Sequence, residues 1–119
     1  DEGNRIMLNR GLAVKEAANQ KYCTDAFSRA VFCAICRDAG VPLQRFANRS
    51  DMPGGSTLGN LSNMQVSMHA VDVGLPQLAM HSSYETAGVA DIALGTAALE
   101  AFYNADMCIE DADFAELRP

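Results

Sequence analysis

The sequence predicts an α/β fold that forms part of a larger layered domain. Three short segments with strand character alternate with two longer helical segments, an alternation typical of strands and helices packed in layers. Two or three parallel strands with two helices leave part of a sheet uncovered, so we expect a partial sheet with flanking helices and open edges. The length of 119 residues suits one domain and excludes two full domains.

The first half of the chain predicts a strand, a helix and a second strand. Residues 12–17 have strand character, and Thr24 or Asp25 can cap the helix that follows. The helix has apolar residues at helical spacing, namely Phe27, Ala30, Val31, Ala34 and Ile35. Gly40 is a stop signal of the expected kind, and residues 42–48 can form the second strand.

A loop, a short helical turn and a third strand come next. The loop covers residues 48–59 and contains Pro53 and three Gly, which exclude regular structure. The helical turn is expected near residues 60–67, and residues 69–74 form the third strand.

The last predicted helix runs from Ser83 to about Asn104 and is rich in Ala. Gly88 and Gly95 weaken it and can mark a break. Its candidate core positions are Val89, Ile92, Ala93, Ala97, Leu99 and Phe102.

The negative charge of the chain is concentrated at its C-terminal end. The net charge is -6, and residues 100–119 contribute -5 because six acidic residues oppose Arg118 alone. We therefore divide the chain into a folded part, residues 1–104, and an acidic tail, residues 105–119, that keeps it soluble. Nucleic-acid binding needs a basic surface, so we expect no nucleic-acid partner.

The sequence shows no membrane or export signal. Its wholly apolar runs are only a few residues long, whereas a bilayer span needs about 20. Residues 1–5 are polar and lack the order of a signal peptide. They also lack an initiator Met, so we expect that a segment has been removed or omitted upstream.

The four Cys do not form a pattern typical of disulfides or of a metal site. Cys33 and Cys36 lie in the middle of the first helix, and Cys23 and Cys108 are isolated. We expect buried or half-buried free thiols in a reducing cytoplasm.

Two His are candidates for chemistry. His81 lies in an irregular stretch after the third strand, and open α/β sheets bind ligands at the carboxyl ends of their strands. Two interpretations remain open for His81, a metal ligand and a cap of the next helix. His69 begins a predicted strand beside Met68, and we interpret it as structural.

The Gly-rich loop over residues 51–57 also follows a strand. Gly54 and Gly55 let a ligand approach the backbone closely, which is compatible with an anion site. The loop lacks the Gly-Lys-Ser/Thr ending of a nucleotide loop. Asp51 is a candidate metal ligand or a residue that caps its own turn, and Asx turns are the commoner use.

Lys15 and Tyr22 are the remaining candidates. Lys15 lies within the first strand between Val14 and Glu16, so it is either solvated at a sheet edge or directed into a site. Tyr22 can place a phenol near the same strand, and spacing alone does not decide its role.

Four blocks of sequence together resemble one enzyme family. They are residues 18–25 (ANQKYCTD), 48–59 (NRSDMPGGSTLG), 71–82 (VDVGLPQLAMHS) and 84–87 (YETA). In order and spacing they are similar to the C-terminal part of the aspartyl and vacuolar aminopeptidases, over roughly residues 4–104. The resemblance implies the C-terminal portion of a two-zinc peptidase catalytic domain, which a second domain interrupts. Such enzymes are cytoplasmic or vacuolar, assemble as large tetrahedral particles, and in several cases prefer acidic N-terminal residues.

The resemblance also implies roles for single residues. His81 falls on the last zinc ligand of the family, whereas Lys15 and Tyr22 fall on residues that contact substrate. The wall of the substrate pocket corresponds to Met52, Gly54, Gly55 and Ser56. Asp51 organises this loop, because the carboxylate ligands of the family lie upstream. In the implied reaction a Glu base and two zinc ions activate water and stabilise the oxyanion.

This chain departs from the family pattern in several places. Gly54 stands where many members have Cys, Leu12 replaces a Pro, and residues 5–7 lack a usual His-Arg-Pro. The first His ligand, the bridging Asp, the paired Glu residues and one further Asp are absent from these 119 residues. A zinc site needs about three or four protein ligands, so the site is incomplete here and no catalytic residue is assigned.

Three functional hypotheses follow. The first is the C-terminal fragment of a zinc aminopeptidase, inactive alone, which needs the remainder of the catalytic domain, binds a peptide substrate and forms homo-oligomers. The second is a non-catalytic interaction or oligomerisation module derived from that fold. The third is an anion-binding module that uses the Gly54-Gly55 loop. We expect a cytoplasmic location, no membrane partner, and an Asp and a His-Pro-Asn-like segment shortly upstream of this chain.

Overall fold

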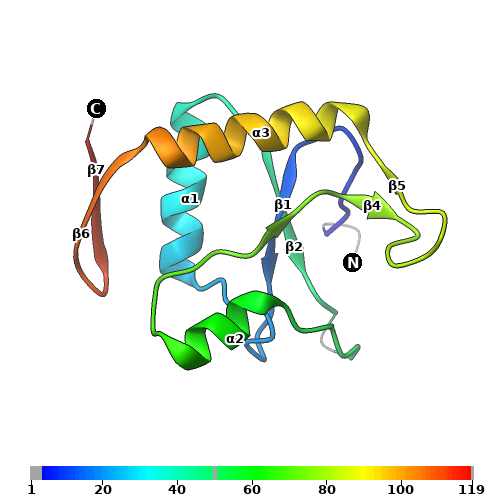
Figure 1. The fold of residues 1–119 in the computed structure, drawn as a ribbon, viewed down its shortest axis with the longest axis horizontal. Coiled ribbons are helices and arrows are strands. Elements are labelled where there is room, and N and C mark those ends of the chain that lie inside the picture. The colour runs from blue at the N-terminus through cyan, green and yellow to red at the C-terminus, as the bar shows by residue number, and fades with distance from the viewer. Residues whose placement is uncertain (1–3, 50, 119) are drawn as a thin grey trace.

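A computed structural model describes residues 4–49 and 51–118, and it confirms a mixed α/β fold (Figure 1). The polar residues 1–3, Ser50 of the predicted loop and the last residue of the predicted tail lie outside the described residues. The elements are β1 (Leu12–Glu16), α1 (Ala26–Asp38), β2 (Leu43–Ala47), α2 (Leu58–Gln65), β3 (Val73–Gly74), β4 (Gln77–Leu78), β5 (Thr86–Ala87), α3 (Val89–Asn104), β6 (Asp106–Asp111) and β7 (Phe114–Arg118).

The central sheet has three strands in the order β2-β1-β3. β1 and β2 run parallel, with Leu12 opposite Leu43, as predicted. β3 runs antiparallel to β1, with Ala13 opposite Gly74, so the expectation of a third parallel strand is wrong. The reason is the position of α2, which lies below the carboxyl ends of β1 and β2 in Figure 1, so the chain re-enters the sheet from that end.

Helix α1 begins at a capping box. The carboxylate of Asp25 accepts a hydrogen bond from the backbone N–H of Ser28 at 2.7 Å, and the Ser28 hydroxyl accepts one from the N–H of Asp25 at 3.1 Å. Of the two predicted caps, Asp25 is therefore the one used. Phe32 and Ile35 lie on the buried face of α1, and Arg37 is in its last turn.

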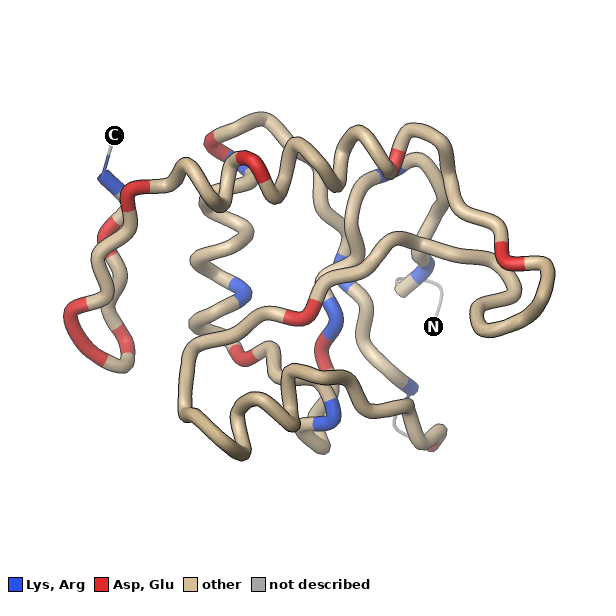
Figure 2. The backbone as a smooth tube through the Cα atoms, viewed as in Figure 1, with Lys and Arg blue, Asp and Glu red and all other residues tan. Residues whose placement is uncertain are grey.

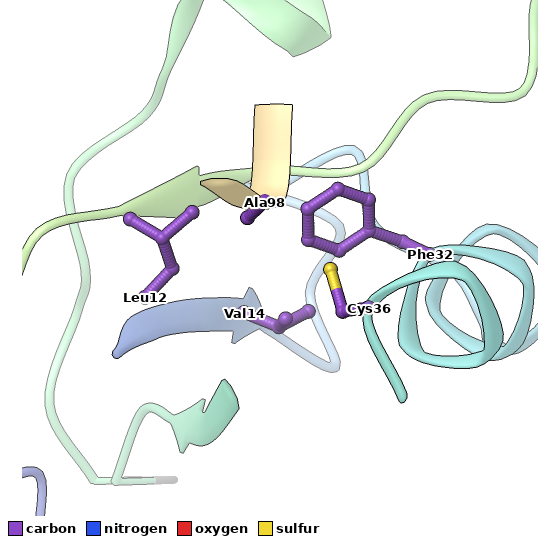
Figure 3. Packing of buried hydrophobic residues seen from close by; sticks show 5 residues of the cluster. All are labelled: Leu12, Val14, Phe32, Cys36 and Ala98. Atoms are coloured by element: carbon purple, nitrogen blue, oxygen red, sulfur yellow. The ribbon is translucent and has the colours of Figure 1, made fainter. Parts of the chain in front are cut away.

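The core is formed where α1 and α3 pack against β1 (Figure 3). Leu12 and Val14 from β1 meet Phe32 and Cys36 from α1 and Ala98 from α3. One turn before Ala98, a Cβ atom at Gly95 would lie 3.3 Å from the Leu12 side chain. Gly95 therefore lets α3 approach β1 closely. The helix continues through Gly95, although the sequence allowed a break there.

Helix α3 starts later than predicted, and it buries a different face. It begins at Val89 rather than Ser83, because residues 86–87 pair with β4 in a small hairpin. None of the six predicted core positions is buried, because Ala97 is half-buried and Val89, Ile92, Ala93, Leu99 and Phe102 are exposed. The buried residues of α3 are Asp91, Gly95 and Ala98. Since apolar residues occur on all sides of α3, hydrophobicity does not mark one face, and the small residues decide which side approaches the sheet.

The remaining predicted elements are close to those observed. The second strand is confirmed at β2, and the helical turn is confirmed at α2, two residues earlier than predicted. The third strand is shorter than residues 69–74, because only Val73 and Gly74 pair with β1. His69 lies before β3, where its ring centroid is 4.5 Å from that of Phe27.

The C-terminal segment, predicted only as an acidic tail, forms a hairpin of β6 and β7. Asp106 pairs with Arg118 at its open end, and Figure 2 shows acidic residues both along the strands and at the closed end. Among the residues that the structure describes, no helix combines the length and the apolar character required to cross a membrane.

Candidate functional site

Lys15 and Tyr22 lie side by side in the structure. β1 is the central strand, so Lys15 is not an edge residue, and its side chain is 23% exposed. Its Nζ lies 5.6 Å from the centroid of the Tyr22 ring, a distance typical of a cation–π contact. Tyr22 itself is buried. The connection between β1 and α1 therefore brings together the two residues that resemble substrate contacts.

Asp72 is a member of this cluster that the sequence reasoning missed. Its Oδ1 lies 3.7 Å from Lys15 Nζ, and its Oδ2 accepts a hydrogen bond from the Thr57 hydroxyl. Its backbone N–H donates to the hydroxyl of buried Thr24 at 2.7 Å. An acidic residue within the predicted third strand gave no local signal, because its three partners come from distant segments.

The Gly-rich loop is attached to the segment that carries Tyr22. Lys21 Nζ donates to the carbonyl oxygen of Gly54 at 3.0 Å. The Asn60 amide donates to the carbonyl of Lys21 at 2.6 Å and to the hydroxyl of Ser56 at 3.2 Å. Met52 is largely exposed at the other end of the loop. Lys21 thus places a second ammonium group beside the candidate pocket.

Asp51 and Gly54 determine the local shape of the loop. Arg49 donates two hydrogen bonds to the Asp51 carboxylate, at 3.0 and 2.6 Å, so this side chain pairs with a cation. A Cβ atom at Gly54 would lie 1.9 Å from Asn48 Nδ2. A Cys at this position, as in many members of the resembled family, therefore requires the Asn48 amide to turn away.

Glu16 is adjacent to Lys15 but faces the other side of the sheet, because strand residues alternate. It accepts hydrogen bonds from Arg29 and Arg45. Burial raises the pKa of Glu16, but these hydrogen bonds and the two guanidinium charges outweigh it and lower the pKa below the usual 4.5. Glu16 is therefore an ion-pair residue outside the candidate site.

The four Cys are free thiols, with Cys36 buried and the others half-buried as predicted. Burial raises the pKa of Cys36 to about 11, and the neighbouring Cys33 adds to the effect. Burial also raises the pKa of Cys23, and the negative charge of Asp72 contributes. Neither Cys36 nor Cys23 has the lowered pKa of a reactive nucleophile.

His81 lies at a different end of the sheet from the other candidate residues. It is exposed in the turn between β4 and β5, with a positive φ of 67°, and its N–H donates to the Glu85 carboxylate. The helix-cap interpretation is wrong, because α3 begins eight residues later with Gly88 as its N-cap. Because β3 is antiparallel, this turn and the Gly-rich loop follow strands that end at opposite ends of the sheet.

The described residues do not complete a metal site. Within residues 4–49 and 51–118, no group of three or more His, Cys, Asp or Glu side chains is placed to hold a metal ion. The exposed imidazole of His81 fits the contribution of one ligand to a zinc ion. A single donor does not fit a whole site, so no reaction step is derived through zinc in this chain.

Comparisons with known proteins agree on one family. Residues 1–103 match the family model described as aminopeptidase I zinc metalloprotease (M18). A probable M18 family aminopeptidase 2 from Clostridium novyi is 48% identical over 104 residues, which cover 87% of this chain and 24% of that protein. The chain therefore spans about a quarter of the length of the curated relatives it matches.

Solved structures share the fold. One chain in the complex of Ape4 and Nbr1 gives a TM-score of 0.83 with 33% identity, covering 87% of this chain and 20% of that one. The mApe1 dodecamer of S. cerevisiae gives a TM-score of 0.73 with 24% identity, covering 86% and 22%, and it supports the fold alone. The family match ends at residue 103, so the hairpin of β6 and β7 lies beyond it.

Proposed function

Because this chain belongs to the M18 family of aminopeptidases, we propose that it is the C-terminal part of a zinc-dependent enzyme that removes N-terminal residues from peptides. The observation that carries the proposal is that residues 1–103 match the family while covering about a quarter of its relatives. The missing zinc ligands and the Glu base then come from outside this chain, which is inactive alone.

In this proposal the chain supplies substrate contacts and one metal ligand. Lys15 and Tyr22 bind the substrate, and the loop containing Met52, Gly54, Gly55 and Ser56 forms a wall of the pocket. His81 is the single zinc ligand. The ammonium groups of Lys15 and Lys21 support a preference for an acidic N-terminal residue, since a carboxylate pairs well with such donors.

Peptide release and metal content test the proposal directly. The purified chain should release no N-terminal Asp, Glu or Leu from anilide substrates with zinc present, and turnover by the chain alone would contradict it. Zinc content should be equal in the wild type, in His81→Ala and in the control His69→Ala. Tight zinc that is lost only in His81→Ala would reveal a complete site and refute the fragment proposal.

Binding of L-aspartate provides the positive test of the substrate role. We expect L-aspartate to change the NMR signals of Lys15 and Tyr22 more than L-leucine does, and Lys15→Met to abolish the difference. Equal responses to the two amino acids would refute the acidic preference. Phosphate and nucleotides should not raise the unfolding temperature, and stabilisation by either would favour the anion-binding module.

A non-catalytic oligomerisation module is the second candidate, and α3 supports it. Val89, Ile92 and Tyr103 are 85%, 61% and 80% exposed along α3, and exposed large apolar residues on one element are typical of interaction surfaces. A relative of the same fold is described as a dodecamer. We propose that copies of this chain associate in the cytoplasm, where the four thiols stay reduced. Light scattering should show a mass above 12.7 kDa, and a strict monomer would contradict self-association.

A further inference from the structure

Asp72 contacts every segment of the candidate substrate site except the turn of His81. Its carboxylate is 3.7 Å from Lys15 Nζ and accepts a hydrogen bond from Thr57, next to Ser56 of the pocket loop. Its backbone N–H donates to Thr24, two residues after Tyr22. Its carbonyl accepts the backbone N–H of Lys15 at 2.8 Å. One residue therefore connects β1, the tyrosine segment and the loop.

The contact with Lys15 restrains the ammonium group without occupying its donors. A direct hydrogen bond between nitrogen and oxygen is about 2.7–3.2 Å long, and the 3.7 Å separation exceeds this range. The attraction is mainly between charges, in a setting where the two side chains are only 23% and 10% exposed. The three N–H groups of Lys15 stay available for a second acceptor.

Two neighbours restrict the position of Lys15 further. A Cβ atom at Gly74 would lie 3.0 Å from Lys15 Cε and 3.2 Å from Nζ, so the end of the side chain lies against this backbone. The Tyr22 ring covers another side of the ammonium group, at 5.6 Å. Asp72 provides the charged contact among these neighbours of Lys15. It also binds the pocket loop through its hydrogen bond from Thr57.

We propose that Asp72 is a positioning residue that fixes the Lys15 ammonium group relative to the pocket loop, and thereby sets how long an acidic side chain the pocket selects. This inference rests on the proposed substrate role of Lys15. L-aspartate and L-glutamate differ by one methylene group, so a fixed cation distinguishes them by distance. A mobile cation follows either carboxylate and distinguishes them less.

The first experiment measures Lys15 itself by side-chain ¹⁵N NMR in the wild type and in Asp72→Asn. Loss of the carboxylate charge should shift the Lys15 Nζ signal and raise the exchange rate of its hydrogens about two- to fivefold, the range that a partly exposed ion pair supports. Asp38→Asn removes an exposed charge on α1 and should change neither quantity. Thr57→Val should alter the NMR signals of the pocket loop but leave the Lys15 Nζ signal at its wild-type chemical shift.

Two further observations keep the inference decidable. If Asp72→Asn does not fold, Asp72→Glu retains the charge but moves it by one methylene group, and an unchanged Lys15 signal would overturn the inference. In folded Asp72→Asn, the ratio of the dissociation constants for L-aspartate and L-glutamate should move toward one. A ratio and a Lys15 signal identical to the wild type would also overturn it.

The outcomes separate this inference from the proposed function. If neither amino acid perturbs Lys15 in the wild type, the proposed substrate role of Lys15 fails, and the exchange measurement still decides whether Asp72 positions it. If L-aspartate perturbs Lys15 but Asp72→Asn changes nothing, the substrate role stands and the positioning role of Asp72 fails.

Discussion

The side chain of Asp91 is completely buried, although aspartate usually stays at the surface. Its two oxygens accept hydrogen bonds from the backbone N–H groups of Asn9 at 2.7 Å and Gly11 at 2.8 Å. These bonds replace the water that the carboxylate loses, and they fix the entry into β1. A buried carboxylate with this pairing is a structural residue whose loss leaves backbone donors without partners.

We therefore predict that Asp91→Ala lowers the free energy of unfolding by about 3 kcal/mol, because the buried N–H of Gly11 and the partly buried N–H of Asn9 lose their carboxylate acceptor. Urea denaturation followed by circular dichroism measures this loss. The control is Asp38→Ala, whose side chain is 65% exposed, and it should change stability by less than about 0.5 kcal/mol. Equal stability of the two variants would show that the bonds to Asp91 contribute little.

Glu16 gives the chain a pH-dependent stability. Its pKa in the folded chain is below the value of 4.5 that we take for the unfolded chain, so folding favours the ionised form. This contribution is complete above about pH 4.5 and is lost as the pH falls through the lower, folded-state pKa. The stability difference between wild type and Glu16→Gln should thus be constant near neutral pH and shrink in acid. Denaturation at several pH values checks this, and a pH-independent difference would refute it.

Cys36 should be the least reactive thiol of the folded chain. Its pKa of about 11 leaves almost no thiolate in mildly alkaline buffer, and its side chain is inaccessible. Iodoacetamide should therefore modify half-buried Cys108 before Cys36, and denaturant should remove the difference. Peptide mapping by mass spectrometry distinguishes the two sites, and early modification of Cys36 in the folded chain would contradict its burial.

Sequence reasoning at the scale of single residues found Lys15 and Tyr22 but missed Asp72 and Asp91. Tyr22 lies within a block that resembles a family, and Lys15 falls on a residue that the same resemblance implies. Asp72 also lies within such a block, but the roles of the two Asp residues depend on partners far along the chain. Asp72 and Thr24 are 48 residues apart, and Asp91 and Asn9 are 82 apart. No periodic pattern encodes such pairs, so they appear only when the chain is folded.

At the scale of elements, α3 is capped by a residue from another part of the chain. Its N-cap, Gly88, has no side chain to accept the first N–H groups. The side chain of Asn9 does so, with its Oδ1 3.0 Å from the N–H of Ala90, and Asp91 returns the bond to the N–H of Asn9. The two segments form a reciprocal cap equivalent to a capping box.

Loss of this cap should destabilise the chain moderately. We predict that Asn9→Ala lowers the free energy of unfolding by about 1 kcal/mol, the typical value of a side-chain cap. Asn9→Gly should cost less, because Asn9 has a φ of 61° that Gly adopts without strain. Thermal denaturation measures both, with exposed Asn104→Ala as control. If Asn9→Gly were the more damaging of the two, strain at Asn9 would not matter.

The elements were predictable where polar residues mark one face. The spacing of Phe27, Val31 and Ile35 predicts α1 nearly to its ends, because the charged residues Arg29, Arg37 and Asp38 mark its outer side. The start of α3 was misplaced because its cap comes from Asn9, outside the local sequence. The hairpin of β6 and β7 was missed because its strands carry many acidic residues, and its pairing gave no local signal.

At the scale of the whole molecule, the C-terminal hairpin is separable from the core. The buried cluster comes from β1, α1 and α3, and the strands β6 and β7 contribute none of its members. We predict that a chain ending at Asn104 stays folded, with its unfolding temperature lowered by less than about 5 °C. Differential scanning calorimetry checks this. A truncated chain that does not fold would show that the domain extends past residue 104.

The uncovered edges of the sheet were also predictable from the sequence, whereas the direction of β3 was not. Three strands and two main helices cannot enclose a sheet, and within the described residues β2 and β3 have no outer neighbour. The direction of β3 depends on the end of the sheet at which α2 lies, because the chain enters β3 from there. Composition does not reveal this position.

The central position of β1 has a consequence for the order of folding. β1 precedes the other described elements along the chain, but the Asp91 carboxylate that fixes its entry follows Gly11 by 80 residues. Closing such a long loop has a high entropic cost and is slow. Until it closes, the unpaired apolar strand can associate with other chains. A nascent chain therefore keeps β1 exposed until α3, which carries Asp91, has been synthesised, so the yield of folded protein should depend on chaperones and on the speed of translation.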